Sequence, residues 1–258
     1  MLETAIKAAK NAGVVLKKYF ETNLQREIKD DGSIVTIADK ETEKIIIQTI
    51  SEVYPDHAFL GEEGGEQNQG SEFIWVIDPI DGTTNFVNGI PLFAISIALL
   101  KNDEHVVSVI YNPITDTIFV AEKGKGAYCN GRRFSVSSQD AKTGMITIGT
   151  SSGAKDKELV RKLFYHAHDY IKSVRYLGSA VIELGYLARG GTEGFINVGT
   201  KKWDYAAGTL IVLEAKGIIT NFDGNPWQLD QNYFIASNKI IHPELLELVK
   251  RARVKDHH

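Results

Sequence analysis

Residues 73–85, FIWVIDPIDGTTN, carry two aspartates three positions apart directly after an apolar run. Residues 73–77 are apolar and β-prone, which predicts a buried strand. Pro79 lacks a backbone donor and should break the strand, whereas Gly82 permits a turn that other residues resist. Asp78 and Asp81 are therefore expected where a buried strand ends, followed by free amides and two hydroxyls. Because carboxylates bind hard cations such as Mg²⁺ and free amides at a helix start bind phosphate, the pattern favours metal-assisted chemistry on a phosphate ester.

The same segment has a simpler interpretation as a turn. Asp, Pro and Gly are common turn residues, and Asp-Gly is a frequent hairpin signal. A second acidic pair, in residues 61–64 (GEEG), follows another apolar stretch at residues 57–60. Adjacent acids that are held near other acids need a cation or raised pKa values, although a solvated loop would also accommodate Glu62 and Glu63.

Three motifs together resemble those of the inositol monophosphatase family. They are DPIDGT at residues 78–83, GEE at residues 61–63 and WDYAAG at residues 203–208. The family belongs to the lithium-sensitive, Mg²⁺-dependent phosphomonoesterases, together with fructose-1,6-bisphosphatases. The resemblance extends from the first predicted helix to about residue 247. It implies hydrolysis of a small polyol phosphate, most simply inositol 1-phosphate, and sensitivity to Li⁺.

The resemblance also implies a set of metal ligands. Glu62, Asp78 and the backbone carbonyl of Ile80 would hold a first Mg²⁺. Asp78, Asp81 and Asp204 would hold a second, and a third, looser ion would lie beside Glu62. A site with two such ions needs several carboxylates, and these three separated segments supply them. Asp204 alone would also suit the N-cap of a helix.

By the same resemblance, Thr83 hydrogen-bonds to Asp39, and this pair orients the attacking water together with Glu62. No covalent phosphoenzyme is then expected, and the amides of Gly82 and Thr83 would hold the phosphate. Two structural alternatives stay open. Thr83 is an ordinary turn residue, and Asp39 lies three residues after Thr36, as in a weak form of the capping box, or it serves as a first-turn acid.

The alcohol side of the substrate matches the family less closely. Gly178, Ser179 and Ala180 align with the segment that contacts the polyol. Asn197 stands where animal-type enzymes place a Glu that binds ring hydroxyls, and a neutral amide makes weaker bonds than a carboxylate. The mobile metal-binding loop, which contains Lys29, is one residue shorter than in the family. Inositol specificity is therefore less well defined than the reaction.

Composition limits the remaining classes of function. The chain has 258 residues, of which 43% are apolar and 24% charged, as expected for one large domain or two packed halves. We place the halves at residues 1–140 and 141–258. The net charge of −4 without a basic stripe argues against a nucleic-acid partner. The single cysteine, Cys129, cannot form an internal disulfide and suits a reducing cytoplasm.

No apolar run is long enough to cross a membrane, and the N-terminus does not resemble a signal peptide. We therefore expect a cytoplasmic protein with no membrane partner, and by resemblance a homodimer. His257 and His258 resemble the stub of a purification tag and receive no function.

Periodicity predicts an α+β fold, a layered sandwich whose first sheet is mainly antiparallel. The resemblance implies alternating helix and sheet layers, an α/β/α/β/α sandwich of the inositol monophosphatase and fructose-1,6-bisphosphatase type. The predicted helices cover residues 2–20, a segment after Thr36 that ends before Pro55, 156–171, 181–189, 204–216 and a last segment from Pro243. The predicted strands cover residues 73–77, 90–100, 106–111, 117–122, 133–136, 145–149, 195–198, 218–222 and 234–237.

Several rival functions fit the same motifs. A fructose-1,6-bisphosphatase, a broad sugar phosphatase or a histidinol phosphatase would use the same fold and metals. A rival outside enzymes is a metal-binding regulatory protein that has no turnover.

Overall fold

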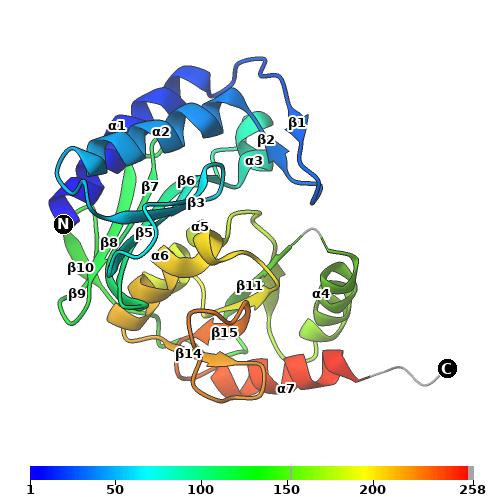
Figure 1. Cartoon of the computed structure of the whole chain (residues 1–258). Coiled ribbons are helices and arrows are strands. Elements are labelled where there is room, and N and C mark those ends of the chain that lie inside the picture. The colour runs from blue at the N-terminus through cyan, green and yellow to red at the C-terminus, as the bar shows by residue number, and fades with distance from the viewer. Residues whose placement is uncertain (152, 255–258) are drawn as a thin grey trace.

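The computed structural model describes residues 1–151 and 153–254, and Figure 1 shows their arrangement in five layers. His257 and His258 lie outside the described residues. From one side to the other, the layers are a pair of helices, a sheet, a second pair of helices, a second sheet and a third pair of helices. This order confirms the predicted α+β layered sandwich. In the described part of the chain, no helix is long and apolar enough to cross a membrane.

The first layer consists of α1 (Leu2–Tyr19) and α2 (Ile37–Ser51), which pack on each other and on one face of the larger sheet. Ala5, Ala8, Ala9 and Ala12 line the buried side of α1 with no exposed area. These small side chains recur at helical spacing, so the helix axis can approach the sheet closely. A short hairpin of β1 (Glu27–Ile28) and β2 (Ile34–Val35) precedes α2.

The larger sheet has eight strands and forms the second layer. β3 and β5 are parallel, and the other neighbours are antiparallel, so the expected mainly antiparallel sheet is confirmed. In spatial order the strands are β10 (Arg132–Phe134), β9 (Gly126–Cys129), β8 (Thr117–Glu122), β7 (Glu104–Asn112), β6 (Ala94–Lys101), β5 (Phe73–Asp81), β3 (Ala58–Gly61) and β4 (Gly65–Gln67).

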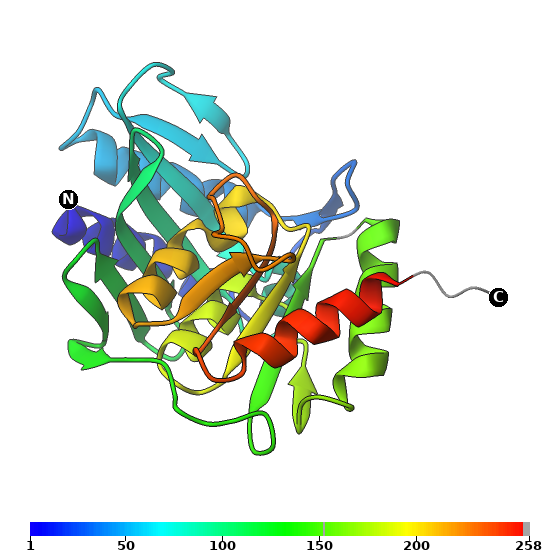
Figure 2. The same cartoon turned by 90° about the horizontal axis from the view of Figure 1, so that it is seen from below.

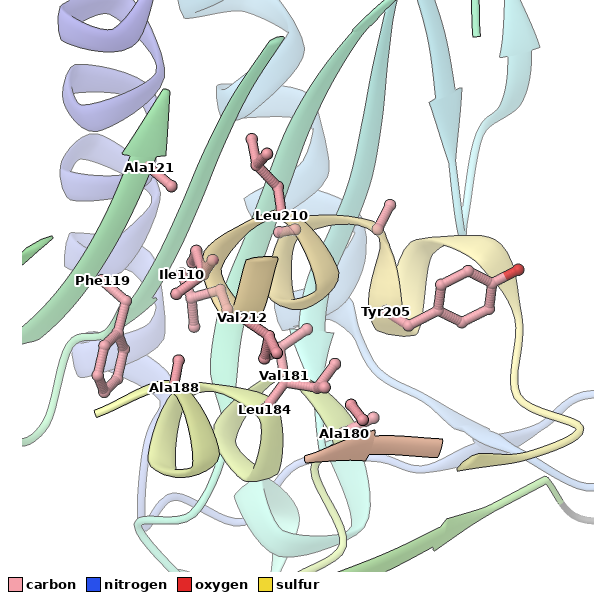
Figure 3. Close-up of a cluster of buried hydrophobic side chains, with 14 of the residues drawn as sticks. Ile110, Phe119, Ala121, Ala180, Val181, Leu184, Ala188, Tyr205, Leu210 and Val212 are labelled. Carbon is pink, nitrogen blue, oxygen red and sulfur yellow. The ribbon is translucent and has the colours of Figure 1, made fainter. Parts of the chain in front are cut away.

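The third layer is the pair α5 (Ala180–Ala188) and α6 (Lys202–Glu214), which lies between the two sheets. Leu184, Leu210 and Val212 from these helices meet Phe119 and Ile110 of the larger sheet in one apolar cluster (Figure 3). The same cluster includes residues of the second sheet. Both sheets therefore share a core through α5 and α6.

The second sheet is mixed and has five strands. In spatial order they are β12 (Ser173–Arg175), β11 (Met145–Thr150), β13 (Gly194–Val198), β15 (Tyr233–Ser237) and β14 (Ile218–Asn221). The last layer, α4 (Ala154–Ala167) and α7 (His242–Arg253), covers its outer face, as Figure 2 shows from below.

The predicted division at residues 140 and 141 falls in the connection between β10 and β11, where the chain passes from one sheet to the other. We keep it as a proposal, because α5 and α6 bury their side chains against both sheets.

Several element ends differ from the prediction. β5 continues to Asp81 instead of ending before Pro79, because a bulge lets the strand pass the proline. β6 begins at Ala94, since the residues around Pro91 form no ladder, and α4 ends at Ala167 rather than at residue 171. α6 begins at Lys202, two residues before the predicted start. The short strands β1, β2, β4, β9 and β12 were not predicted.

The contact between α5 and α6 depends on Gly208. A Cβ added at this position would lie 2.5 Å from Leu184 Cδ1 and 2.7 Å from Leu184 Cβ. We predict that Gly208→Ala destabilises the protein by about 1–3 kcal/mol, because overpacking outweighs the helix preference of Ala, which is worth about 1 kcal/mol. Denaturant unfolding measures the change.

Gly185→Ala in α5 is the matched control, because its nearest neighbour is a carbon of the Phe119 ring at 3.0 Å. It should lose less stability than Gly208→Ala. A Gly208→Ala protein as stable as the wild type would contradict this account of the helix contact.

Candidate active site and metal centre

A one-residue bulge in β5 brings Asp78 and Asp81 to the same side of the sheet. Asp78 pairs with Ser96 and Asp81 pairs with Ala94, so two residues of β5 stand opposite one residue of β6. In a regular strand, residues three apart point to opposite faces. The bulge reverses this alternation. Asp78 Oδ1 accepts a hydrogen bond of 2.9 Å from the Ile80 amide, which holds the irregular segment.

Asp204 joins the two strand acids from α6. One carboxylate oxygen from each of Asp78, Asp81 and Asp204 lies within 4.8 Å of the others. The hydroxyl of Ser96, the strand partner of Asp78, donates to the Trp203 carbonyl at 3.2 Å and fixes the start of α6 against the sheet. Asp204 Oδ2 also accepts the Lys201 amide at 2.7 Å, so the helix-capping alternative describes a second contact of the same residue.

Burial of these acids is the main electrostatic fact of the site. Asp78 is 1% exposed and Asp81 is 8% exposed. Burial, with smaller contributions from the neighbouring charges, raises the pKa values of Asp78 and Asp204 well above their ordinary range. Burial also raises the pKa of Asp81 to about 7, against hydrogen bonds that lower it. A set of oxygen donors that repel one another in this way fits a hard divalent cation such as Mg²⁺.

Glu62 lines the same cavity from the loop that connects β3 and β4. Its amide donates to the Ile77 carbonyl at 3.1 Å, which attaches this loop to β5. The Lys29 ammonium lies 2.9 Å from Glu62 Oε1 and 2.5 Å from Glu63 Oε1. Lys29 therefore lies beside the acid that the resemblance assigns to metal binding.

Thr83 connects the cavity with Asp39. Thr83 Oγ1 lies 3.3 Å from Asp39 Oδ1 and 3.0 Å from the Ile80 carbonyl, and either oxygen can accept its hydrogen. The other Asp39 oxygen accepts the amide and the hydroxyl of Thr36, so the capping arrangement and the contact with Thr83 coexist. Burial raises the pKa of Asp39 to about 6, although the bonds from Thr36 oppose this shift.

Gly82 and the start of α5 close another wall of the cavity. Gly82 has a φ of 94°, and an added Cβ would lie 3.1 Å from the Gly178 carbonyl, so only glycine fits. The Ser179 hydroxyl and the Val181 amide donate to Asp81 Oδ2 at 2.5 and 2.8 Å. Gly178, Ser179 and Ala180 all line the cavity.

The structure does not bring Asn197, the predicted polyol contact, into the lining of the cavity. Asn197 lies in β13 with no exposed area and does not line the cavity. Its amide nitrogen donates to the Asn232 carbonyl at 2.8 Å, and its oxygen accepts the Thr200 hydroxyl at 2.9 Å. Counting residues from Asp204 gave its place in the chain but not the direction of its side chain.

Several residues of the site were missed. Glu43 is 4% exposed and accepts the amides of Glu63 at 3.0 Å and Gly64 at 2.6 Å, so it shapes the loop that carries Glu62. Its position four residues after Asp39, on the same face of α2, was the available signal. Other cavity residues without a sequence signal are Gly149, Thr150, Tyr176, Glu183 and Thr200.

The chain is similar in sequence and in structure to known proteins. Residues 1–254 match the profile of the inositol monophosphatase family. The chain is 38% identical to an inositol-1-monophosphatase of Mesorhizobium japonicum, over 97% of this chain and 96% of the relative. It is 39% identical to the Nus factor SuhB of Escherichia coli K12, over 92% and 89%. A solved inositol monophosphatase structure from Thermotoga maritima has a TM-score of 0.90 at 32% identity and covers 97% of both chains. The chain therefore belongs to the inositol monophosphatase family.

The raised pKa values of the buried aspartates predict how the stability of the metal-free protein depends on pH. Unfolded aspartates titrate near pH 4, whereas Asp39 and Asp81 titrate at about 6 and about 7 in the folded protein. The folded state holds more protons between these values, so the metal-free protein should lose stability as the pH rises from about 4 to 7. Thermal unfolding in chelator at pH 5 and pH 7.5 measures this loss.

Mg²⁺ should reduce this loss, because a bound cation compensates the charged carboxylates. A melting temperature in chelator that is the same or higher at pH 7.5 than at pH 5 would contradict the prediction. It would show that burial does not disfavour the ionised form of these acids.

Glu43 gives a second prediction. Glu43→Gln keeps one acceptor but turns an NH₂ group towards one of the two loop amides, which leaves that amide unpaired at a cost of about 1–3 kcal/mol. We expect the Mg²⁺ concentration that gives half-maximal stabilisation against heat to rise about tenfold. The reason is that about one kcal/mol or more of the free energy that holds the Glu62 loop in place is lost.

Glu52→Gln is the matched control, because Glu52 is exposed at the C-terminal end of the same helix. It should leave the Mg²⁺ response unchanged. Equal responses in both variants would show that Glu43 does not position the Glu62 loop.

Proposed function

We propose that this member of the inositol monophosphatase family is a Mg²⁺-dependent phosphomonoesterase that hydrolyses a small polyol phosphate. Inositol 1-phosphate is the substrate that we expect first. The observation that carries the proposal is the group of buried Asp78, buried Asp81 and half-buried Asp204, with carboxylate oxygens within 4.8 Å, beside the Thr83–Asp39 pair. The donors are all oxygens, which is the chemistry that Mg²⁺ prefers.

In this proposal two Mg²⁺ ions are held by Glu62, Asp78, Ile80, Asp81 and Asp204. A third ion lies near Glu62. When bound, the ions would activate water and stabilise the leaving oxygen of the ester. A set of four acids from β5, the β3–β4 loop and α6 gives the site its negative charge without a cation, so a phosphate group alone would be repelled.

Thr83 and Asp39 act on the attacking water. Thr83 donates its hydrogen towards Asp39 or Ile80, which leaves a lone pair of Oγ1 free to accept a hydrogen from water in the cavity. Asp39, whose pKa burial raises to about 6, is suited to accept a proton near neutral pH. The backbone amides of Gly82 and Thr83 would bind phosphate oxygens, and water would be the nucleophile.

The rival functions stay distinct hypotheses. A fructose-1,6-bisphosphatase, a sugar phosphatase or a histidinol phosphatase would share the metal site and differ in the alcohol pocket. The similarity to a protein named Nus factor SuhB keeps a role outside hydrolysis open, including one with a nucleic-acid partner. Binding of RNA, measured by fluorescence anisotropy at two salt concentrations, tests our expectation that there is none.

The experiment that tests the proposed function is a comparison of substrates with Mg²⁺ and in chelator. We expect turnover of inositol 1-phosphate to exceed that of fructose 1,6-bisphosphate and histidinol phosphate, to cease in chelator and to return poorly with Ca²⁺, whose coordination is looser. Asp81→Asn should lower turnover on the order of a hundredfold or more in a folded protein.

Full activity in chelator would overturn the metal-dependent mechanism, and no turnover of any phosphate ester would favour the regulatory alternative. Inhibition by Li⁺, a homodimer and a cytoplasmic location remain predictions that follow from the family.

A further inference from the structure

Glu183 is a buried carboxyl group in the wall of the active-site cavity that the proposed mechanism does not use. It lies in α5, has no exposed area and lines the same cavity as Asp81. Its Oε1 atom accepts the Leu177 amide at 2.6 Å. Its second oxygen, Oε2, has no hydrogen-bond partner among the described residues.

An unpaired buried carboxyl oxygen is unfavourable and therefore informative. Six other buried side-chain atoms in the described chain also lack a partner, but their residues do not line the cavity. Burial raises the pKa of Glu183 well above its ordinary value, which agrees with an environment that does not compensate the group. The unpaired oxygen of Glu183 thus belongs to a residue of the cavity wall, and the atom itself is enclosed by the protein.

Gly149 borders this oxygen and also lines the cavity. A Cβ added at Gly149 would lie 3.4 Å from Glu183 Oε2 and 2.8 Å from Phe195 Cζ. Gly149 is the strand partner of Asn197, the residue whose side chain turns away from the cavity. Glu183 is thus an acid of the cavity lining that lies beside Gly149 of β11, apart from the acids that the resemblance assigns to metal binding.

The position of Glu183 relative to the acid cluster indicates which part of a substrate it meets. α5 starts at Ser179, whose hydroxyl bonds to Asp81, and Glu183 lies about one helical turn further on. Glu183 makes no hydrogen bond or ion pair with Asp78, Asp81 or Asp204 in the described contacts. A phosphate held at the cluster would place its alcohol part towards Glu183.

We propose that Glu183 Oε2 accepts a hydrogen bond from a hydroxyl group of the alcohol part of the substrate. This inference rests on the proposed function and narrows its substrate class. Esters that carry a hydroxyl near the phosphate-bearing carbon are preferred over esters that carry none, because only the former satisfy the buried oxygen.

Glu183→Gln tests the proposal with two substrates, inositol 1-phosphate and phenyl phosphate, whose leaving group has no further hydroxyl. The amides of Leu177 and Gly178 require an acceptor, so the Gln carbonyl takes the place of Oε1 and an NH₂ group replaces Oε2. We expect kcat/KM for inositol 1-phosphate to fall roughly tenfold to a hundredfold, the range for leaving a buried hydrogen-bonding group unpaired. For phenyl phosphate the change should be less than about threefold, because the lost contact is absent there.

Glu193→Gln is the matched control, because Glu193 is 5% exposed but lies outside the cavity lining. Its oxygens are paired with the Ser137 hydroxyl at 3.1 Å and the Met145 amide at 2.5 Å. This variant should lose stability without a change in the ratio of the two kcat/KM values. The Mg²⁺ concentration for half-maximal thermal stabilisation, measured on both variants, reports whether the metal site is intact.

An unchanged ratio in folded Glu183→Gln protein with a normal Mg²⁺ response overturns the proposal, as does an equal loss on both substrates. If Glu183→Gln does not fold, Glu183→Asp, which keeps the carboxyl group but withdraws Oε2, must lower the same ratio or the proposal fails. A wild-type protein without turnover of either ester would instead overturn the proposed function.

Discussion

The structure depends on the energetic cost of holding several carboxylates together in a buried place. Asp78 and Asp81 share one side of the sheet only because β5 contains one extra residue opposite β6. A regular strand would send one of the two acids into the apolar layer under α1 and α2. The bulge therefore produces the acid cluster, and acids held together in this way either bind a cation or retain protons.

Hydrogen bonds to the acids fix their geometry from three directions. Ser179 and Val181 in α5 bind Asp81, and the start of α6 is fixed by the Ser96–Trp203 contact beside Asp204. These contacts join the larger sheet to the helices that also pack on the second sheet. Binding of a cation would thus tighten the contact between the two halves, because its ligands come from both.

The sequence predicts the layers well, and it locates acids that the structure brings together, because each depends on a local pattern. Apolar periodicity sets α1 and β7, and the two acidic motifs each follow an apolar strand. The sequence does not predict the path of β5 past Pro79, since a bulge depends on the register of its neighbour β6. Side-chain direction is equally non-local: Asn197 turns towards Asn232, which is 35 residues away, and this contact has no signal near either residue.

Glu43 and Glu183 show why part of the site escapes motif analysis. Each lies within a helix, as glutamates on exposed helix faces commonly do, and each is buried because a backbone amide of a neighbouring loop requires an acceptor. Both carboxylate oxygens of Glu43 accept such an amide, so neither is left unpaired. The role of Glu43 is therefore to shape the loop that carries Glu62. Glu183 has one oxygen unpaired in the cavity wall, and this is the oxygen that we propose accepts a substrate hydroxyl. The number of acceptors that remain unpaired separates a positioning acid from a binding acid, and sequence alone does not give that number.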